Sequence, residues 1–284
     1  MIKLKYHKLI LNKRIYNEGD YIYVYMVGRI GNVMFQIAAA STLAKKHNCK
    51  LIAIPALYKV SEPDNCLLIE YLQQFKKTIL RNVDICIKPP TIYRSAYFEP
   101  YFHYNPIIYL PNIFIKGYFQ SEKYFNRNLV NELFRIDDAT SKVINDKYGE
   151  ILSLPGITSI NVRRGDYLKL SDYHPICTLD YYNRAIDIIG RDRPYLITSD
   201  DLNWCRKNFV GDYFYFADYT SPTYDLYLQT MCKNNIISNS TFSWWGAWLN
   251  NDKDKLVISP KKWFGPKYAI NDTKDLIPSE WIKT

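Results

Sequence analysis

Two consecutive arginines, Arg163 and Arg164, end the apolar run of a β-strand predicted over 157–163, and Gly165 and Asp166 follow them. Ligands of an open α/β sheet bind outside the carboxyl ends of its strands, and the planar fork of an arginine suits phosphate oxygens. Because successive strand residues point to opposite faces, we expect one arginine to hold an anion and the other to brace the loop through Asp166. A structural salt bridge is the alternative interpretation, and this stretch alone does not decide between the two.

A second polar stretch follows a strand predicted at 235–238 and opens a helix predicted at 241–250. Its residues are Asn239, Ser240, Thr241 and Phe242. Hydroxyl side chains and free backbone N–H groups at a helix N-terminus can bind phosphate, whereas the simpler interpretation makes Ser240 only the helix cap. Three tryptophans follow closely in the sequence, and this favours packing in the core over a binding platform.

A third candidate stretch, Ser199 with Asp200 and Asp201, follows a strand predicted at 194–198. Ser199 is a suitable helix N-cap, and the two acids suit the first helical turn. Alternatively, the carboxylate of Asp200 accepts hydrogen bonds from a ribose or a base.

A glycine-containing turn is predicted at 28–32, between a strand at 21–27 and a helix at 33–47. Glycines such as Gly31 let a backbone approach a ligand at a helix N-terminus. The pattern on its own is weak, and a plain tight turn explains it equally well.

The chain has 284 residues, enough for two domains, and its second half alternates strands with helices as in a doubly wound parallel sheet. We predict a boundary after residue 155, giving domains at 1–155 and 156–284. Residues 1–20 are expected to form a loose extension, and 56–115 short strands and loops punctuated by prolines. Further strands are predicted at 51–54, 213–216 and 255–259, and further helices near 125–134, 141–148, 179–189, 200–209 and 223–233.

The formal net charge of +9 suits an anionic partner, but no run of five basic residues occurs and no nucleic-acid motif is present, so no nucleic-acid partner is expected. The six cysteines include no C-x-x-C pair, which favours reduced, mostly buried thiols over a zinc site. Without an export signal or an apolar stretch of membrane-spanning length, we expect a cytoplasmic protein and leave peripheral membrane contact open. Asp252 and Asp254 are the one pair that the sequence offers as metal ligands, and a solvated turn is the preferred interpretation. Nothing in the pattern indicates an oligomeric state.

Taken together, the motifs resemble those of the α-1,2-fucosyltransferases of glycosyltransferase family 11. The matching segments, which run from about residue 24 to about 265, are 28–36, 117–125, 162–167, 179–182, 199–201 and 239–245. The resemblance implies a GT-B fold, with two Rossmann-like domains facing a central cleft. It also implies GDP-fucose as donor, inversion at the anomeric carbon, no required metal or other cofactor, and an oligosaccharide acceptor with a terminal β-galactoside. Transfer of another nucleotide sugar, or binding of a nucleotide or glycan without catalysis, remain alternatives.

The family motif His-x-Arg-Arg-x-Asp falls on Asn161, Arg163, Arg164 and Asp166, so the histidine of the motif is an asparagine here. The resemblance implies that at least one arginine contacts the GDP phosphates, and it extends the donor site to Gly31, Asn161, Asp200 and residues 239–242. It places Asn32 at the reacting centre, where an amide can position a hydroxyl but is too weak a base to deprotonate it. Arg163, Asn32 and Asp166 are therefore the catalytic candidates, and the sequence identifies no general base.

Overall fold

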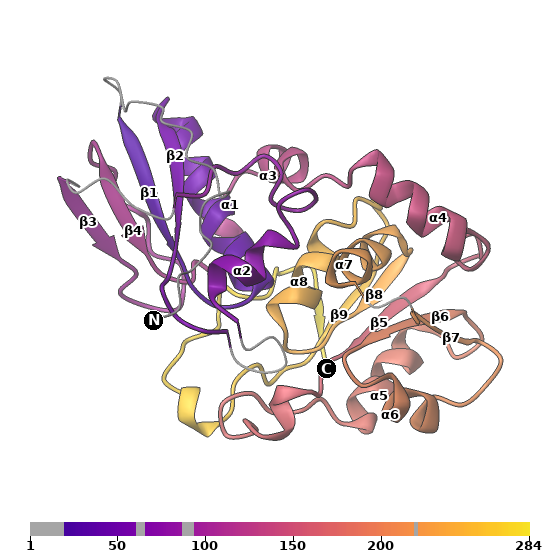
Figure 1. Ribbon diagram of the computed structural model, residues 1–284. Helices are drawn as coiled ribbons and strands as arrows, with labels where there is room; N and C mark the ends of the chain where they lie inside the picture. Colours follow the sequence, from indigo (N-terminus) through magenta and orange to yellow (C-terminus); the bar gives the residue numbers. More distant parts are fainter. Residues whose placement is uncertain (1–19, 61–65, 87–93, 219–220) are drawn as a thin grey trace, which may run out of the picture.

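The computed structural model describes residues 20–60, 66–86, 94–218 and 221–284. They form an α/β architecture with two parallel sheets, one in each half of the chain (Figure 1). This confirms the predicted fold class of two Rossmann-like units. The extension predicted at 1–20 lies outside the described residues except for Asp20.

The first sheet has four strands in the order β2-β1-β4-β3, and every pair of neighbours is parallel. Its strands are β1 (Tyr21–Met26), β2 (Lys50–Pro55), β3 (Ser95–Phe98) and β4 (Ile113–Lys116). The helices of this half are α1 (Ile30–Lys46), α2 (Leu68–Gln73), η1 (Glu122–Tyr124), α3 (Arg127–Leu133) and α4 (Asp138–Leu152). Parallel strands place their carboxyl ends at one edge, so the segments that follow β1, β3 and β4 meet there.

The second sheet has six parallel strands in the order β10-β9-β8-β5-β6-β7. Its strands are β5 (Thr158–Val162), β6 (Tyr195–Ser199), β7 (Phe214–Phe216), β8 (Asn234–Ile236), β9 (Val257–Ser259) and β10 (Ile282–Lys283). The helices are η2 (Asp166–Leu168), α5 (Leu179–Ile189), α6 (Leu202–Asn208), α7 (Pro222–Met231), α8 (Thr241–Trp248) and η3 (Pro266–Tyr268). The three candidate stretches at 163–166, 199–201 and 239–242 therefore end the central strands β5, β6 and β8.

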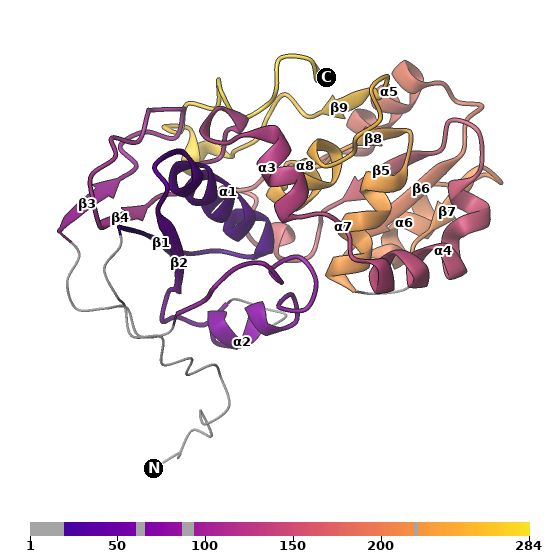
Figure 2. The ribbon, with the colours of Figure 1, turned by 90° about the horizontal axis from the view of Figure 1, so that it is seen from above.

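The two halves are joined through α1 and α8, which lie between the sheets in Figures 1 and 2. Phe35 of α1 packs 4.5 Å from the ring of Trp244 and 4.7 Å from that of Trp245, and all three side chains are fully buried. The indole Nε1 of Trp245 donates to the Gly31 carbonyl at 2.9 Å. Aromatic pairs add about 0.5–1.5 kcal/mol each beyond burial, so this contact fixes the relative position of the sheets. It confirms that the tryptophans form core.

One hydrophobic cluster includes residues of both halves, from Ile22 to Trp281. The segment after β9 also returns to the N-terminal half, over α1 and α3 in Figure 2. There Asp275 pairs with Lys123 at 2.5 Å and accepts the backbone N–H of Tyr104 at 3.1 Å. The domain boundary after residue 155 stays a prediction, because the two sheets share this core.

Three local predictions are wrong. The turn predicted at 28–32 is shorter, because α1 begins at Ile30 and takes Gly31 and Asn32 into its first turn. Only Gly28, at φ +82°, requires a glycine's backbone freedom there. Helix α2 was missed in the proline-punctuated region. The N-cap of α6 is Asp201, whose carboxylate accepts the Trp204 N–H at 3.1 Å, rather than Ser199.

Candidate active site

Arg163 is held at the end of β5 by two carboxylates. Its guanidinium contacts Asp166 at 2.5 Å and Asp200 at 2.8 Å, and its side chain is 21% exposed. Burial opposes its charge, but Asp200 and Asp166 outweigh that effect and raise the pKa of Arg163 above its usual value. The predicted brace through Asp166 is therefore present, and Asp166 and Asp200 both occupy the guanidinium.

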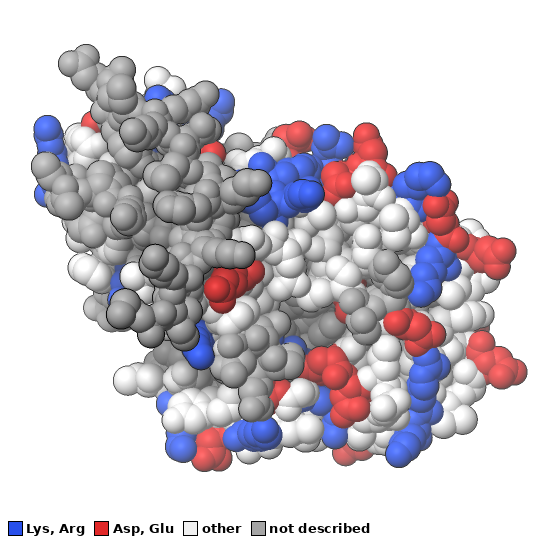
Figure 3. Space-filling model, in the orientation of Figure 1, with Lys and Arg blue, Asp and Glu red and all other residues white. Residues whose placement is uncertain are grey.

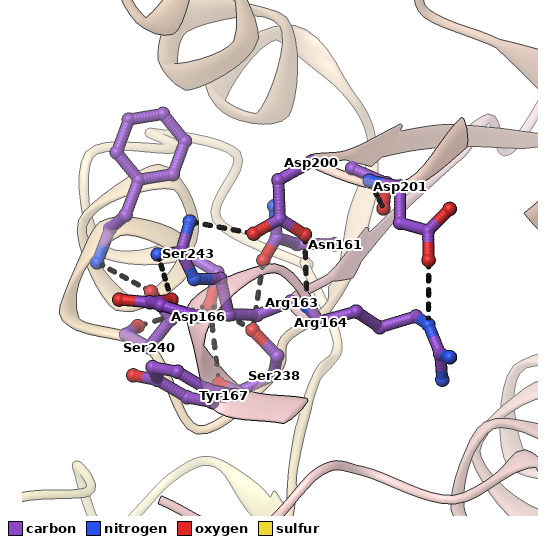
Figure 4. Close-up of polar contacts among 12 residues, drawn as sticks. Asn161, Arg163, Arg164, Asp166, Tyr167, Asp200, Asp201, Ser238, Ser240 and Ser243 are labelled. Atoms are coloured by element: carbon purple, nitrogen blue, oxygen red, sulfur yellow. Dashed lines mark hydrogen bonds and ion pairs between the residues drawn. The ribbon is translucent and has the colours of Figure 1, made fainter. Parts of the chain in front are cut away.

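Arg164 points the other way (Figure 4). Its Nε donates to Asp201 at 3.0 Å, and its guanidinium carbon lies 4.0 Å from the centre of the Trp204 ring. In Figure 4 Arg163 turns toward Ser240, while Arg164 turns toward Asp201 and away from it. The two side chains point to opposite sides, as expected of successive strand residues. Arg163 makes the brace to Asp166, and which arginine holds an anion stays a prediction. Arg163 is the arginine on the side of Ser240 (Figure 4), and Arg164 is held by Asp201, the N-cap of α6, and by Trp204 of α6.

Asp200 ties the ends of β5 and β6 together. Besides Arg163, its carboxylate accepts the backbone N–H of Arg164 at 2.9 Å. A Cβ on Gly165 would lie 2.5 Å from its Oδ2, so only glycine fits opposite this carboxylate. Asp200 therefore belongs to the site through its hold on Arg163, and its predicted contact with a ribose or base stays a prediction.

The N-terminus of α8 forms the next part of the site. Ser240 is the cap, because its Oγ accepts the Phe242 N–H at 3.3 Å. A Cβ on Gly31 would lie 2.6 Å from the Phe242 nitrogen and 2.6 Å from Thr241 Oγ1. Gly31 thus lets the first turns of α1 and α8 meet, so the positive ends of both helix dipoles lie together there.

A hydrogen-bonded bridge crosses between the halves at this point. Asn32 Oδ1 accepts from Thr241 Oγ1 at 3.0 Å and from Gln120 Nε2 at 3.0 Å. Gln120 is 5% exposed, and its Oε1 is buried without a partner. Asn32 and Thr241 were predicted to belong to the site, whereas Gln120 was not, although it lies in the family-like segment 117–125. The signal is its place in the segment that follows β4, a neighbour of β1 in the sheet.

Asn161 and Asn239 have structural roles that the sequence did not predict. Asn161 donates to Thr198 Oγ1 at 3.0 Å and accepts from Ser238 Oγ at 2.8 Å. The amide nitrogen of Asn239, a residue 1% exposed, donates to the carbonyls of Pro175 and Trp263. Both amides are hydrogen-bonded within the protein, and the predicted contact of these residues with the sugar-nucleotide donor stays a prediction. They hold the ends of β5 and β8 in place.

His174 is a further residue that sequence analysis missed. Its ring stacks on Tyr167 at 4.8 Å, and the Tyr167 ring carries the Arg163 guanidinium at 5.3 Å. Burial lowers the pKa of His174, Asp166 opposes that shift, and Arg163 reinforces it. His174 Nδ1 is buried without a partner. A neutral imidazole therefore borders the arginine, in a loop whose sequence carries no helix or strand periodicity.

The remaining predictions concern charge and metals. Asp252 and Asp254 lie in a turn and face Lys233 at 2.6 and 3.9 Å. Within the described ranges, no three acidic, histidine or cysteine side chains gather as a metal site. All six cysteines are free, three of them buried and three partly exposed. On the face shown in Figure 3, basic and acidic side chains of the described residues alternate and do not form a basic stripe.

Two surface cavities, of about 600 and 170 Å³, lie elsewhere. The larger is lined by Ile157 and Lys233, which precede β5 and β8, so it opens at the amino edge of the sheet, opposite the site. Neither cavity is lined by a candidate catalytic or donor-binding residue, and the larger one includes Asp252. No helix among the residues described is both long and apolar enough to cross a bilayer.

Comparison with known proteins agrees with the resemblance. The model of the family described as glycosyl transferase family 11 matches residues 5–284. The chain is 30% identical to the O-antigen biosynthesis glycosyltransferase WbnK of Escherichia coli, over 92% of this chain and 99% of that one. It is 26% identical to an α-1,2-colitosyltransferase of Escherichia coli, over 91% of this chain and 97% of that one. It is 25% identical to galactoside α-(1,2)-fucosyltransferase 1 of Saimiri boliviensis boliviensis, over 80% of this chain and 64% of that one.

Proposed function

The chain belongs to glycosyltransferase family 11 and is a glycosyltransferase, and from this premise we propose that it transfers L-fucose from GDP-fucose to the 2-hydroxyl of a terminal β-galactosyl residue, with inversion. The names of the colitosyl and fucosyl relatives support α-1,2 transfer of a 6-deoxy sugar. The observation that carries the proposal is the placement of Arg163 on the side of Ser240, the N-cap of α8 (Figure 4), with Asn32 bridging to Thr241 from the opposite half.

The donor's diphosphate is the group this arrangement suits. As the bond between sugar and phosphate breaks, negative charge grows on the leaving GDP, and fixed donors stabilise that charge best. Arg163 supplies a cationic fork, and the first turn of α8 supplies N–H groups and the Thr241 hydroxyl. Each hydrogen bond to a charged group contributes roughly 1.5–3 kcal/mol. This grouping therefore assists departure of GDP without any residue bonding covalently to the sugar.

The carboxylates around Arg163 set the conditions for binding. When all three groups are ionised, Arg163 contributes one positive charge and Asp166 and Asp200 two negative charges, so the cluster is net negative. A diphosphate must then exchange with at least one carboxylate on the guanidinium. In this proposal the diphosphate replaces Asp166 on the guanidinium, because Asp166 lies on the short η2 turn. Asp200 stays in place, since it also accepts a hydrogen bond from the Arg164 backbone.

The acceptor lies on the opposite side in this proposal. Asn32 is held by Thr241 and Gln120, so its amide is fixed at the junction of the two halves. Such fixed positioning of an acceptor hydroxyl lowers the entropic cost of reaction. We propose that no metal is required, since Arg163 and the α8 N-terminus meet the diphosphate charge.

A second donor is favoured by one specific relative, the α-1,2-colitosyltransferase. Colitose lacks the 3-hydroxyl of fucose, so the two GDP-sugars differ by a single hydrogen-bonding group. A site that hydrogen-bonds this hydroxyl discriminates strongly against the sugar lacking it, whereas an apolar site separates the two only weakly.

The decisive experiment incubates the protein with GDP-fucose or GDP-colitose and a panel of galactosides, with the linkage of any product determined by NMR. We expect an α-1,2-fucosylated galactoside, formed at the same rate in excess chelator. Faster transfer of colitose would replace the donor assignment, and loss of transfer in chelator would remove the metal-free mechanism. Binding of GDP-fucose with no product from any acceptor would instead favour a noncatalytic nucleotide-binding protein.

A further inference from the structure

Glu99 is a carboxylate at the carboxyl edge of the four-stranded sheet. It directly follows β3, and its side chain folds over the residues that follow β4. Its Oε2 accepts the Tyr118 N–H at 2.6 Å, and its Oε1 accepts the Phe119 N–H at 3.0 Å. The Phe119 N–H also lies 3.2 Å from Oε2. A carboxylate has about four lone-pair sites, so the two N–H groups leave about one of them for a hydroxyl donor, and the Tyr124 hydroxyl is close enough to occupy it.

The loop that Glu99 holds is under backbone constraint. Phe119 has φ +51°, a left-handed conformation that is uncommon and strained for a non-glycine residue. A Cβ on Gly117 would lie 2.7 Å from Glu99 Oε2, so a larger residue would displace the carboxylate. Gln120, which bridges to Asn32, follows immediately. The constrained loop thus holds Glu99 against the backbone of Tyr118 and Phe119. The next residue, Gln120, reaches the junction between the halves.

The surroundings of Glu99 are phenolic. The titratable groups facing it are Tyr97 of β3, Tyr118 after β4 and Tyr124 of η1. Burial raises the pKa of each phenol, so all three stay neutral near pH 7. Burial also raises the pKa of Glu99 to about 7, against the lowering effect of the Phe119 and Tyr118 N–H groups and of Tyr124. A base is most effective when its pKa lies near the working pH.

Further phenols lie between Glu99 and the donor side. Besides burial, Tyr268 of the C-terminal half, Tyr58 of the N-terminal half and Glu99 are each close enough to Tyr118 to raise the pKa of its phenol. Tyr268 lies 5.5 Å from His174, the histidine stacked beside the ring that carries Arg163. Tyr58, Tyr118 and Tyr268 are each more than one third exposed. Exposed phenol faces around a carboxylate are suited to a neutral sugar ring and its hydroxyls.

We propose that Glu99 is the general base that accepts the proton of the acceptor hydroxyl, in an acceptor site framed by Tyr58, Tyr118 and Tyr268. This inference rests on the proposed function and names its missing base. The acceptor oxygen bonds to the anomeric carbon as its proton passes to Glu99. The bond from that carbon to the diphosphate breaks, and its electron pair leaves with GDP. Glu99 then releases the proton to solvent, so one acceptor and one GDP-sugar yield one glycoside, GDP and a proton.

The test compares Glu99→Gln with Glu132→Gln, an exposed carboxylate on α3 whose removal should leave activity unchanged. For wild type we expect kcat to fall below about pH 7, because a protonated Glu99 cannot accept a proton. Glu99→Gln should lose about 10²–10⁴-fold in kcat and lose this pH limb, since general-base catalysis contributes about that much. Its GDP affinity by calorimetry should stay within threefold, because the diphosphate site lies on the other half.

Three results would overturn the assignment. The first is a Glu99→Gln enzyme that keeps kcat within fivefold of wild type. The second is a change confined to acceptor KM with an unaltered pH profile, which would make Glu99 a positioning residue. The third is loss of the pH limb in His174→Gln but not in Glu99→Gln. If Glu99→Gln does not fold, Glu99→Asp decides: a slower enzyme that keeps the acidic limb supports the base, and an unchanged kcat refutes it.

The outcomes for the base and for the proposed function are separable. A wild-type protein that transfers no sugar refutes the function and, with it, the step assigned to Glu99. A wild type that prefers another GDP-sugar corrects only the donor, and the Glu99 variants are then compared with that donor. An active wild type with an equally active Glu99→Gln refutes the base alone.

Discussion

At the carboxyl edge of the six-stranded sheet the polar groups are charged and mutually paired, with Arg163 between Asp166 and Asp200. At the facing edge of the four-stranded sheet they are the amides of Asn32 and Gln120, phenols, and one carboxylate bound by backbone N–H groups. A cationic fork beside a helix N-terminus suits a diphosphate, whereas amides and phenols suit a polyol. The contrast suggests that the two halves divide the substrates between them.

The largest effect that could break this comparison is expected at Arg163. We predict that Arg163→Lys lowers kcat by about 10²–10³-fold and weakens GDP binding, because a lysine cannot bind bidentately. Arg164→Lys should change GDP affinity far less, since Arg164 faces Asp201 and Trp204. Initial rates and calorimetric titration with GDP measure both effects.

Arg206→Lys is the matched control for Arg164→Lys. Arg206 also pairs with an aspartate, Asp218, and stacks on an aromatic ring, Phe216, but lies outside the site. If Arg164→Lys loses GDP affinity and Arg163→Lys does not, the two roles are exchanged. If both variants bind GDP as wild type does, the diphosphate site lies elsewhere. The assignment of the donor to the edge of the six-stranded sheet is then refuted.

A smaller effect tests whether the two edges must touch. Gly31→Ala should destabilise the protein by about 1–3 kcal/mol, because the new methyl group would meet the backbone of α8 and over-packing costs about that much. It should also reduce kcat, since it separates Asn32 from Thr241. Urea unfolding and initial rates provide the measurements.

Gly149→Ala on α4 is the control for the same substitution in a helix. A Cβ there meets no atom within 4 Å, so alanine should stabilise by up to about 1 kcal/mol through helix propensity. Equal stability changes in the two variants would show that the contact between α1 and α8 is not tight. An unaltered kcat in Gly31→Ala would show that the halves need not be held at this distance.

The same contrast explains how much the sequence could predict. Most strands and helices of the second half lie within one to three residues of the predicted ranges, and α5 has the predicted bounds. Its strands are apolar runs separated by amphipathic helices, so local periodicity and tertiary burial agree. In the region 56–115, prolines interrupt the periodicity, and α2 is only six residues long.

Within the site, residue type and strand-end position predicted the arginines, Asp166, Asp200 and the α8 N-terminus. Side-chain direction was not accessible, because Asn161 and Asn239 turn inward to partners distant in sequence. Glu99 and Gln120 were missed for a related reason. Their importance depends on β3, β4 and β1 being neighbours, and no local pattern encodes that order.

The smallest effect concerns a second carboxyl group, Asp225 of α7 in the C-terminal half. Burial raises the pKa of Asp225 to about 7, as it does for Glu99. The Oδ1 of Asp225 is buried without a partner. Between the unfolded-state pKa near 3.8 and pH 7 the folded protein therefore binds more protons than the unfolded chain. Stability must fall as pH rises through that window, and the loss is complete above pH 7. Asp225→Asn removes this contribution, so its melting temperature should exceed that of wild type at pH 8 and approach it at pH 4. Asp146→Asn, at an exposed pair with Lys142, should change the melting temperature little at either pH.

The acidic limb of kcat should survive in Asp225→Asn and vanish in Glu99→Gln, because only the N-terminal carboxylate is assigned to the acceptor. A melting temperature for Asp225→Asn that tracks wild type at both pH values would refute the stability argument, and loss of the kcat limb in this variant would move the base to the C-terminal half.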